Sequence, residues 1–227
     1  MNIIDNQQEV FIDFSVPDSG RILKVKKWLL SEKYILPNKK CKVLEIGYAR
    51  GGLLDQLSEF KEIEKYAIDV HHRNPKNDIF FYQYDCNNGL PNFDGQQFDI
   101  VFAGEVIEHI IDDKQFLKNI YSIIKPNGIL CLTTPNLFFL VNRLIFPFGR
   151  MPYFAYAPYH YHIYSCKSLT EMIVECEFEV LHITSSHLLI STRRSKVFGI
   201  IFELLGNIFP EFGAHIILFA RKSMGKI

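Results

Sequence analysis

Short apolar runs alternate along the chain with segments in which apolar residues recur at helical spacing. The runs predict buried strands over residues 43–46, 65–69, 79–84, 98–102 and 129–133. Helices are expected over residues 22–29, from residue 53 onward, and from residue 113 to the Pro126-Asn127-Gly128 turn. Strands that alternate with helices favour a parallel, doubly wound α/β sheet.

Two more strands are expected near the end of the chain, over residues 178–184 and 214–220, and Ser165 is expected to cap the helix before them. Asp112 and Gln115 have the spacing of a capping box for the helix from residue 113. Only nine residues separate Asp69 from Ile79, whereas a parallel crossover usually needs about a dozen or more. The connection between these two strands is therefore predicted to be a turn.

The segment CKVLEIGYARGG, residues 41–52, places a tight glycine turn between a strand and a helix. Gly47, Gly51 and Gly52 lack a Cβ and tolerate positive φ, so a ligand can approach this backbone closely. The first N–H groups of the following helix lie beside the turn. Alanine at position 49 excludes the dinucleotide-binding pattern G-x-G-x-x-G.

Acidic residues stand at the carboxyl ends of four successive predicted strands: Glu45, Asp69, Asp85 and Glu105. The carboxyl ends of parallel strands meet at one edge of the sheet, and ligands of open α/β sheets bind at that edge. A single acid at such a position is usually a solvated loop residue. Four of them predict a ligand site.

These motifs resemble those of the class I S-adenosylmethionine-dependent methyltransferases. VLEIGYARGG is similar to the family's first motif, an acid followed two residues later by G-x-G-x-G, with Ala49 at the second glycine position. FDIVFAGEVIEHI and IIKPNGILCLTTPN are similar to the fourth-strand motif and to the turn and strand that follow it. The sequence TPN, followed by a hydrophobic insertion and then histidines, resembles the ubiquinone-biosynthesis O-methyltransferases and many glycan-associated relatives. The resemblance implies a Rossmann-like, mostly parallel seven-stranded sheet with hydrophobic helical insertions and an antiparallel end.

The resemblance also implies S-adenosylmethionine as the cofactor. Asp69 would accept hydrogen bonds from both ribose hydroxyls, and Asp85 would accept one from the adenine amino group. Tyr48 and Ala49 depart from the family pattern, which leaves a catalytically inactive cofactor-binding protein as an alternative. The cofactor-binding residues implied in this way are Glu45, Gly47, Tyr48, Ala49, Gly51, Asp69, Val70, Asp85, Cys86, Gly104 and Glu105.

Methyl transfer from a sulfonium is a direct displacement, so the protein must align two reactants, exclude water and, for some acceptors, remove a proton. His160 or His162, in the aromatic segment YHYHIY, is the candidate general base, because neutral imidazole suits deprotonation of a hydroxyl. A histidine that only packs among tyrosines is the competing interpretation.

Glu105, Glu108 and His109 form the pattern E-x-x-E-H, and His160 could complete a set of four metal ligands. Similar residues bind a divalent ion in small-RNA 2′-O-methyltransferases and in some quinone methyltransferases. A metal-dependent RNA 2′-O-methyltransferase is therefore a further alternative. The same E-H dipeptide is widespread in the superfamily without metal, so we expect no obligatory metal site.

Composition narrows these alternatives. The 227 residues suit one methyltransferase domain, with an N-terminal extension over residues 1–38 and insertions over residues 137–165 and 187–211. The formal net charge is zero, so no DNA partner is expected and an RNA substrate is disfavoured. Five scattered cysteines without a C-x-x-C pair favour a reducing, cytoplasmic location, and the polar start of the chain is unlike a signal peptide.

The insertions indicate the kind of acceptor. Residues 137–148 and 197–209 are too short to span a bilayer and too apolar for ordinary surface helices. Arg193, Arg194 and Lys196 precede the second segment, as in helices that lie on anionic membranes. We expect a hydrophobic lid that admits a small or lipid-like acceptor, methylated at an oxygen, with peripheral membrane contact. Packing of the two segments on each other or across a homodimer interface is the alternative.

Overall fold

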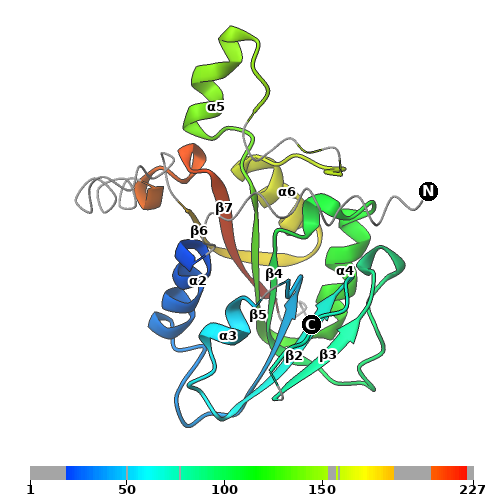
Figure 1. Ribbon diagram of the computed structural model, residues 1–227. Helices are drawn as coiled ribbons and strands as arrows, with labels where there is room; N and C mark the ends of the chain where they lie inside the picture. Colours follow the sequence, from blue (N-terminus) through cyan, green and yellow to red (C-terminus); the bar gives the residue numbers. More distant parts are fainter. Residues whose placement is uncertain are drawn as a thin grey trace.

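A seven-stranded sheet forms the centre of the computed structural model (Figure 1). The structure describes residues 19–49, 51–76, 78–152, 157, 159–186 and 206–223. Across the sheet the strands follow the order β3-β2-β1-β4-β5-β7-β6. Their bounds are Cys41–Ile46 (β1), Ile63–Asp69 (β2), Ile79–Gln83 (β3), Phe98–Gly104 (β4), Ile124–Pro135 (β5), Phe178–Ser185 (β6) and His215–Lys222 (β7).

The strand directions confirm the predicted doubly wound fold. β1 to β5 pair in parallel, and β7 runs antiparallel to both of its neighbours, β5 and β6. The chain order reverses between β1 and β4, so this pair is the switch point at which open α/β sheets bind ligands. His215, the first residue of β7, pairs with Pro135 at the end of β5 and therefore lies at the same edge.

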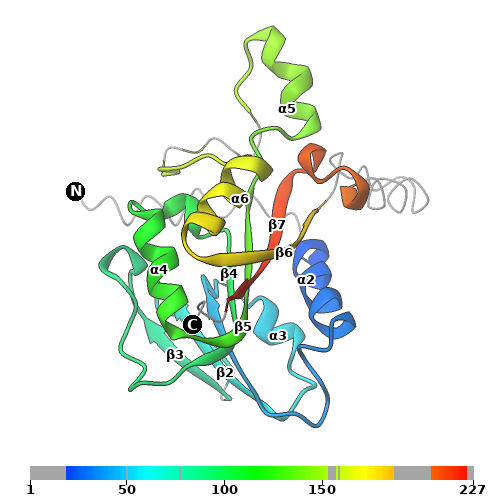
Figure 2. The ribbon, with the colours of Figure 1, turned by 180° about the vertical axis from the view of Figure 1, so that it is seen from behind.

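The helices cover both faces of the sheet (Figures 1 and 2). One core cluster packs α2 and α3 on the sheet, and the other packs α4 and α6 on the opposite face. Trp28 of α2 stacks on Phe219 of β7 with ring centroids 3.9 Å apart. Among the described residues, the helices are α2 (Ser19–Ser31), α3 (Leu53–Gln56), α4 (Asp113–Ile123), α5 (Leu140–Ile145) and α6 (Cys166–Glu175), with 3-10 turns η1 (Cys86–Asn88), η2 (Ile107–His109), η3 (Phe146–Phe148) and η4 (Pro210–Phe212).

Several local predictions are confirmed. Ser165 caps α6 in a full capping box with Ser168. No helix occurs among the described residues between β2 and β3, as the short spacing predicts. Asn127, in the predicted Pro126-Asn127-Gly128 turn, has a φ of 62°, a left-handed conformation that asparagine tolerates.

Other local details differ from prediction. α3 ends at Gln56, because the chain must reverse before β2 starts at Ile63, so the helical spacing that continues through Leu57 and Phe60 extends beyond the helix. The capping box at α4 is only half formed: Asp112 accepts from the Gln115 N–H at 2.9 Å, but the Gln115 side chain donates to Asn119 instead. β5 begins at Ile124, earlier than predicted.

Parts of the predicted extension and insertions lie outside the described residues, namely 1–18, 153–156, 158 and 187–205. The segment with Arg193, Arg194 and Lys196 and most of residues 197–209 fall there. Within the described part of the chain, no helix combines the length and apolar character needed to cross a bilayer.

Candidate active site

The glycine turn after β1 depends on two residues without side chains. Gly47 has a φ of 81°, and a Cβ there would lie 2.5 Å from Cγ2 of Val106. Gly51 has a φ of 101°. Ala49 also adopts a left-handed φ, 49°, although it has a side chain. The turn therefore keeps the shape of a glycine loop at the one position where the sequence departs from glycine.

Glu45 is buried beneath this turn. Its Oε1 accepts from the Leu53 N–H and its Oε2 from the Leu54 N–H, each at 2.9 Å. A Cβ on Gly52 would lie 1.9 Å from Glu45 Oε1. Glu45 thus binds the start of α3 with its carboxylate, and this contact positions the turn that the sequence predicts to bind the cofactor. The dependence on Gly52 was not predicted, although the doubled glycine is visible in the sequence.

Tyr48 packs into the core on the α2 and α3 face. Its ring lies edge-on to Phe81, with centroids 6.4 Å apart, and its hydroxyl donates to Asp55 at 3.3 Å. Burial, followed by the charge of Asp55, raises the pKa of Tyr48 to about 12, so the phenol stays protonated at neutral pH. The bulky residue at this position is therefore accommodated as part of the core.

Asp69, at the end of β2, links the glycine turn to the next loop. Its Oδ2 accepts from the Ala49 N–H at 2.7 Å, and its Oδ1 accepts from the His71 N–H at 2.8 Å. Nε of Arg73 lies 3.4 Å from Oδ1. Arg73 was not predicted as a site residue. A cavity of about 420 Å³ lies beside this turn, lined by Tyr48, Ala49, Asp55, His72, Arg73, Asn74 and Lys76.

The predicted adenine-side residues lie on neighbouring loops. β2 and β3 pair in parallel up to Asp69 and Gln83, so Val70 and Asp85 follow strands that end side by side. Val70 is 48% exposed. Asp85 is exposed and accepts from the Asn87 N–H at 2.9 Å as the cap of η1. Burial raises the pKa of Cys86 to about 12, and this cysteine, like the other four, is a free thiol.

Glu105 follows β4 in a left-handed conformation, with a φ of 55°. Its Oε1 lies 2.7 Å from Nη1 of buried Arg21 in α2, and its Oε2 lies 3.5 Å from Nε2 of His215. Neither partner was predicted, although Arg21 stands one helical turn before Val25 on the apolar face of α2, which is a signal of a buried charge. Gly104, just before Glu105, has no room for a Cβ because the Phe102 ring lies 2.6 Å from its ideal position.

Three of the four candidate metal ligands come together. Ligand atoms of Glu108, His109 and His160 all lie within 4.8 Å of one another. Thr134 donates to Oε2 of Glu108 at 3.0 Å. Burial and the nearby charge of Glu105 raise the pKa of Glu108 well above its usual value, whereas burial and His160 lower the pKa of His109.

The types of donor in this cluster suit a divalent cation, because carboxylate oxygen and neutral imidazole nitrogen are both common ligands. Glu105 is not part of the cluster, since its carboxylate faces Arg21 and His215. His162 is also separate: its Nε2 lies 3.1 Å from the Ile111 carbonyl oxygen and its Nδ1 lies 3.6 Å from Asp113. The structure therefore distinguishes the two histidines that the sequence offered as a base.

The sheet, its switch point and the glycine turn define a class I methyltransferase fold. The sequence profile described as a methyltransferase domain matches residues 21–183, so the chain belongs to this family. The match confirms the predicted family and its cofactor, S-adenosylmethionine.

Curated relatives match over shorter stretches. A ubiquinone biosynthesis O-methyltransferase of Coxiella burnetii is 30% identical over 101 residues, covering 41% of this chain and 43% of the relative. Another, from Bradyrhizobium diazoefficiens, is 46% identical over 41 residues, or 18% of this chain and 16% of the relative. The chain thus spans less than half the length of these relatives.

Solved structures support the fold. A 1,6-didemethyltoxoflavin-N1-methyltransferase of Burkholderia thailandensis has a TM-score of 0.62 and 13% identity, over 96% of this chain and 83% of its own. The N-methyltransferase NodS of Bradyrhizobium japonicum, solved with S-adenosyl-l-homocysteine, has a TM-score of 0.58 and 14% identity, over 93% of this chain and 90% of its own. At such identities the likeness concerns the fold alone.

The Glu45 contact predicts that Gly52→Ala destabilises the protein. The added methyl group would displace the buried carboxylate from the N–H groups of Leu53 and Leu54, at a cost of about 2–4 kcal/mol in unfolding free energy. Gly20→Ala is the matched control, because a Cβ at Gly20 in α2 meets nothing within 4 Å. Urea unfolding of both variants tests this; equal stability of Gly52→Ala and wild type would contradict the role of Glu45.

The cluster around Glu108 allows a direct test for metal. We expect activity to survive chelation, because Glu105 is already paired with Arg21 and Glu108 already accepts a hydrogen bond from Thr134. Methyl transfer should be the same with and without EDTA. Activity that EDTA abolishes and magnesium or manganese restores would show that Glu108, His109 and His160 hold a required ion.

Proposed function

We propose that this protein transfers the methyl group of S-adenosylmethionine to an oxygen of a small or lipophilic acceptor. The observation that carries the proposal is the hydrogen bond between the Ala49 N–H and Asp69, which joins the glycine turn to a buried carboxylate at the carboxyl edge. This edge is where the fold binds ligands. The names of the curated relatives support oxygen as the methylated atom.

Residues along the edge are suited to hold the cofactor. Asp69 would accept from the ribose, either sharing its carboxylate with Arg73 or displacing that guanidinium. Asp85 and the Cys86 N–H would face the adenine, and the turn from Gly47 to Gly51 would carry the methionine part. The cofactor supplies an electrophilic methyl group, so the protein itself needs no nucleophile.

His160 is the better candidate for the general base. Its imidazole lies within 4.8 Å of the buried carboxyl group of Glu108. The ring centroids of His160 and His109 are 4.8 Å apart. In this arrangement the acceptor hydroxyl would give its proton to a ring nitrogen of His160 as its oxygen attacks the methyl carbon of the cofactor, and S-adenosylhomocysteine would leave. His162 contacts the Ile111 carbonyl and Asp113, which supports an orienting role at the start of α4.

The aromatic segment would keep water from the reacting atoms. The Tyr161 N–H donates to the Glu108 carbonyl oxygen at 2.8 Å, and the Tyr159 ring stacks on His109 with centroids 5.2 Å apart. Both contacts hold the segment against η2. A site screened in this way suits an acceptor with an apolar body.

A metal-dependent RNA 2′-O-methyltransferase is the second candidate, supported by the grouping of Glu108, His109 and His160. The zero formal net charge disfavours it, because RNA binding usually draws on an excess of basic residues. Labelled methyl transfer into extracted quinone, glycolipid and RNA pools separates the candidates. A protein that binds the cofactor and labels no pool would be the inactive relative.

Asp69→Ala should weaken binding of S-adenosylhomocysteine by about 10- to 100-fold, because two hydroxyls lose a charged acceptor. Calorimetry measures this affinity, and the unfolding free energy of the same sample separates loss of contact from loss of fold. Glu59→Ala, which removes an exposed carboxylate paired with Lys26, is the control and should bind normally. Unchanged affinity of Asp69→Ala would refute the ribose assignment.

His160→Ala should lower kcat by about 10²- to 10⁴-fold, the usual contribution of a general base, while cofactor affinity stays the same. His162→Ala is the matched comparison, two residues along the same segment, and should retain far more activity. Steady-state kinetics on whichever pool accepts label tests both variants. A larger loss in His162→Ala than in His160→Ala would reverse the assignment.

A further inference from the structure

A short apolar projection stands out from the body of the protein beyond the end of β5 (Figures 1 and 2). It consists of residues 137–152, with α5, η3 and the turn at Gly149, and we refer to it as the apolar finger. Large apolar side chains on it face solvent: Phe148 is 81% exposed, Leu144 and Met151 are each 60% exposed, and Phe138 and Phe146 are each 43% exposed. Exposed apolar groups at this density indicate a contact surface.

The root of the finger is fixed to the body. The Asn136 N–H donates to the Ala214 carbonyl at 2.9 Å, and the Leu137 N–H donates to the Tyr164 carbonyl at 3.0 Å. Phe139 is fully buried, and buried Asn142 donates to the Leu137 carbonyl at 3.1 Å. The exposed tip is thus held outward by a well-packed base.

The charged residues of the apolar finger are all basic. Residues 137–164 contain no aspartate or glutamate, although the chain has 25 acidic residues. The charged residues of the finger are Arg143 and Arg150. Arg143 lies with its guanidinium 4.4 Å from the centroid of Phe212, near the root, and Arg150 is exposed beside the tip. An apolar tip with basic neighbours matches the headgroup boundary of an anionic bilayer, where apolar groups insert and arginines meet phosphates.

The shape and place of the finger also favour a bilayer over a second copy of this chain. It is a narrow projection rather than a broad face, whereas stable dimers bury extended, complementary surfaces. One residue separates it from the end of β5 at Pro135, at the carboxyl edge that carries Glu105 and His215. Insertion of its tip would therefore bring that edge close to the membrane.

We propose that the apolar finger inserts its tip into the headgroup region of an anionic membrane and docks the protein there. This extends the proposed function, because a lipophilic acceptor could then enter the site from the surface on which the protein lies. Docking itself depends only on the finger, so it can be tested without methyl transfer.

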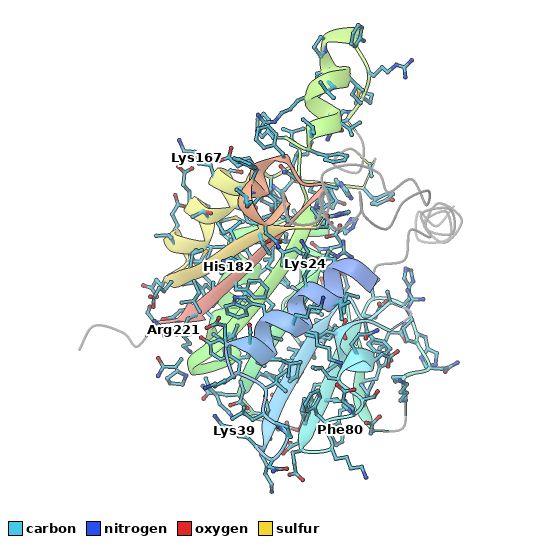
Figure 3. The ribbon with its side chains drawn as sticks, turned by 90° about the vertical axis from the view of Figure 1, so that its left-hand side faces the viewer. Lys24, Lys39, Phe80, Lys167, His182 and Arg221 are labelled. Atoms are coloured by element: carbon cyan, nitrogen blue, oxygen red, sulfur yellow. The ribbon has the colours of Figure 1, made fainter. Side chains whose placement is uncertain are left out.

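The experiment is flotation of the full chain with vesicles of phosphatidylglycerol and phosphatidylcholine in equal parts. Phe148→Asp should weaken partitioning by about tenfold or more, since the phenyl group no longer inserts. Arg150→Glu should weaken it by about fivefold or more and reduce its dependence on salt. Phe80→Asp is the matched control: Phe80 is 59% exposed on β3, at the end of the molecule away from the finger (Figure 3), and partitioning should not change.

Several results would overturn the proposal. The wild type could fail to float with anionic vesicles, or Phe80→Asp could lose as much partitioning as Phe148→Asp. The wild type could also form a dimer that Phe148→Asp dissociates, and not bind vesicles. In that case the apolar finger would contact a second copy of this chain rather than a membrane. Calorimetry with S-adenosylhomocysteine on the same samples tests the proposed function separately, because finger variants should bind it like the wild type.

Discussion

The buried carboxylate of Glu45 is the contact on which the site depends. Its two hydrogen bonds to Leu53 and Leu54 fix the start of α3, and Gly52 leaves the space that the carboxylate needs. A charged group fully removed from water is tolerated only when its oxygens are satisfied. These bonds therefore set the path of the glycine turn, and the turn in turn delivers the Ala49 N–H to Asp69.

Local patterns predicted the fold well because strand and helix periods are properties of neighbouring residues. The positions of the strands, the turn in place of a helix between β2 and β3, and the cap at Ser165 all follow from such patterns. The short α3 and the half-formed box at Asp112 were missed for a different reason. The side chain of Gln115 bonds to Asn119 rather than completing the box, and α3 ends early because the chain must reverse before β2.

The sequence predicted the edge of the sheet at which the acidic residues lie, but not the groups that face them. Acids at strand ends had to meet at one edge, and they do. Which group faces each acid depends on contacts far apart in sequence, such as Arg21 with Glu105 or His215 with the same carboxylate. The difference between His160 and His162 is of this kind too, because only the folded chain shows that the imidazole of His160 lies near the carboxyl group of Glu108.

A crystal structure with S-adenosylhomocysteine tests the central claim most directly. We expect the ribose hydroxyls on Asp69, the adenine beside Asp85 and Cys86, and the sulfur directed toward the cluster of Glu108, His109 and His160. The Arg73 guanidinium should have shifted or shared its contact with Asp69. Ligand bound elsewhere, with Ala49, His71 and Arg73 still holding Asp69 as they do now, would contradict the account.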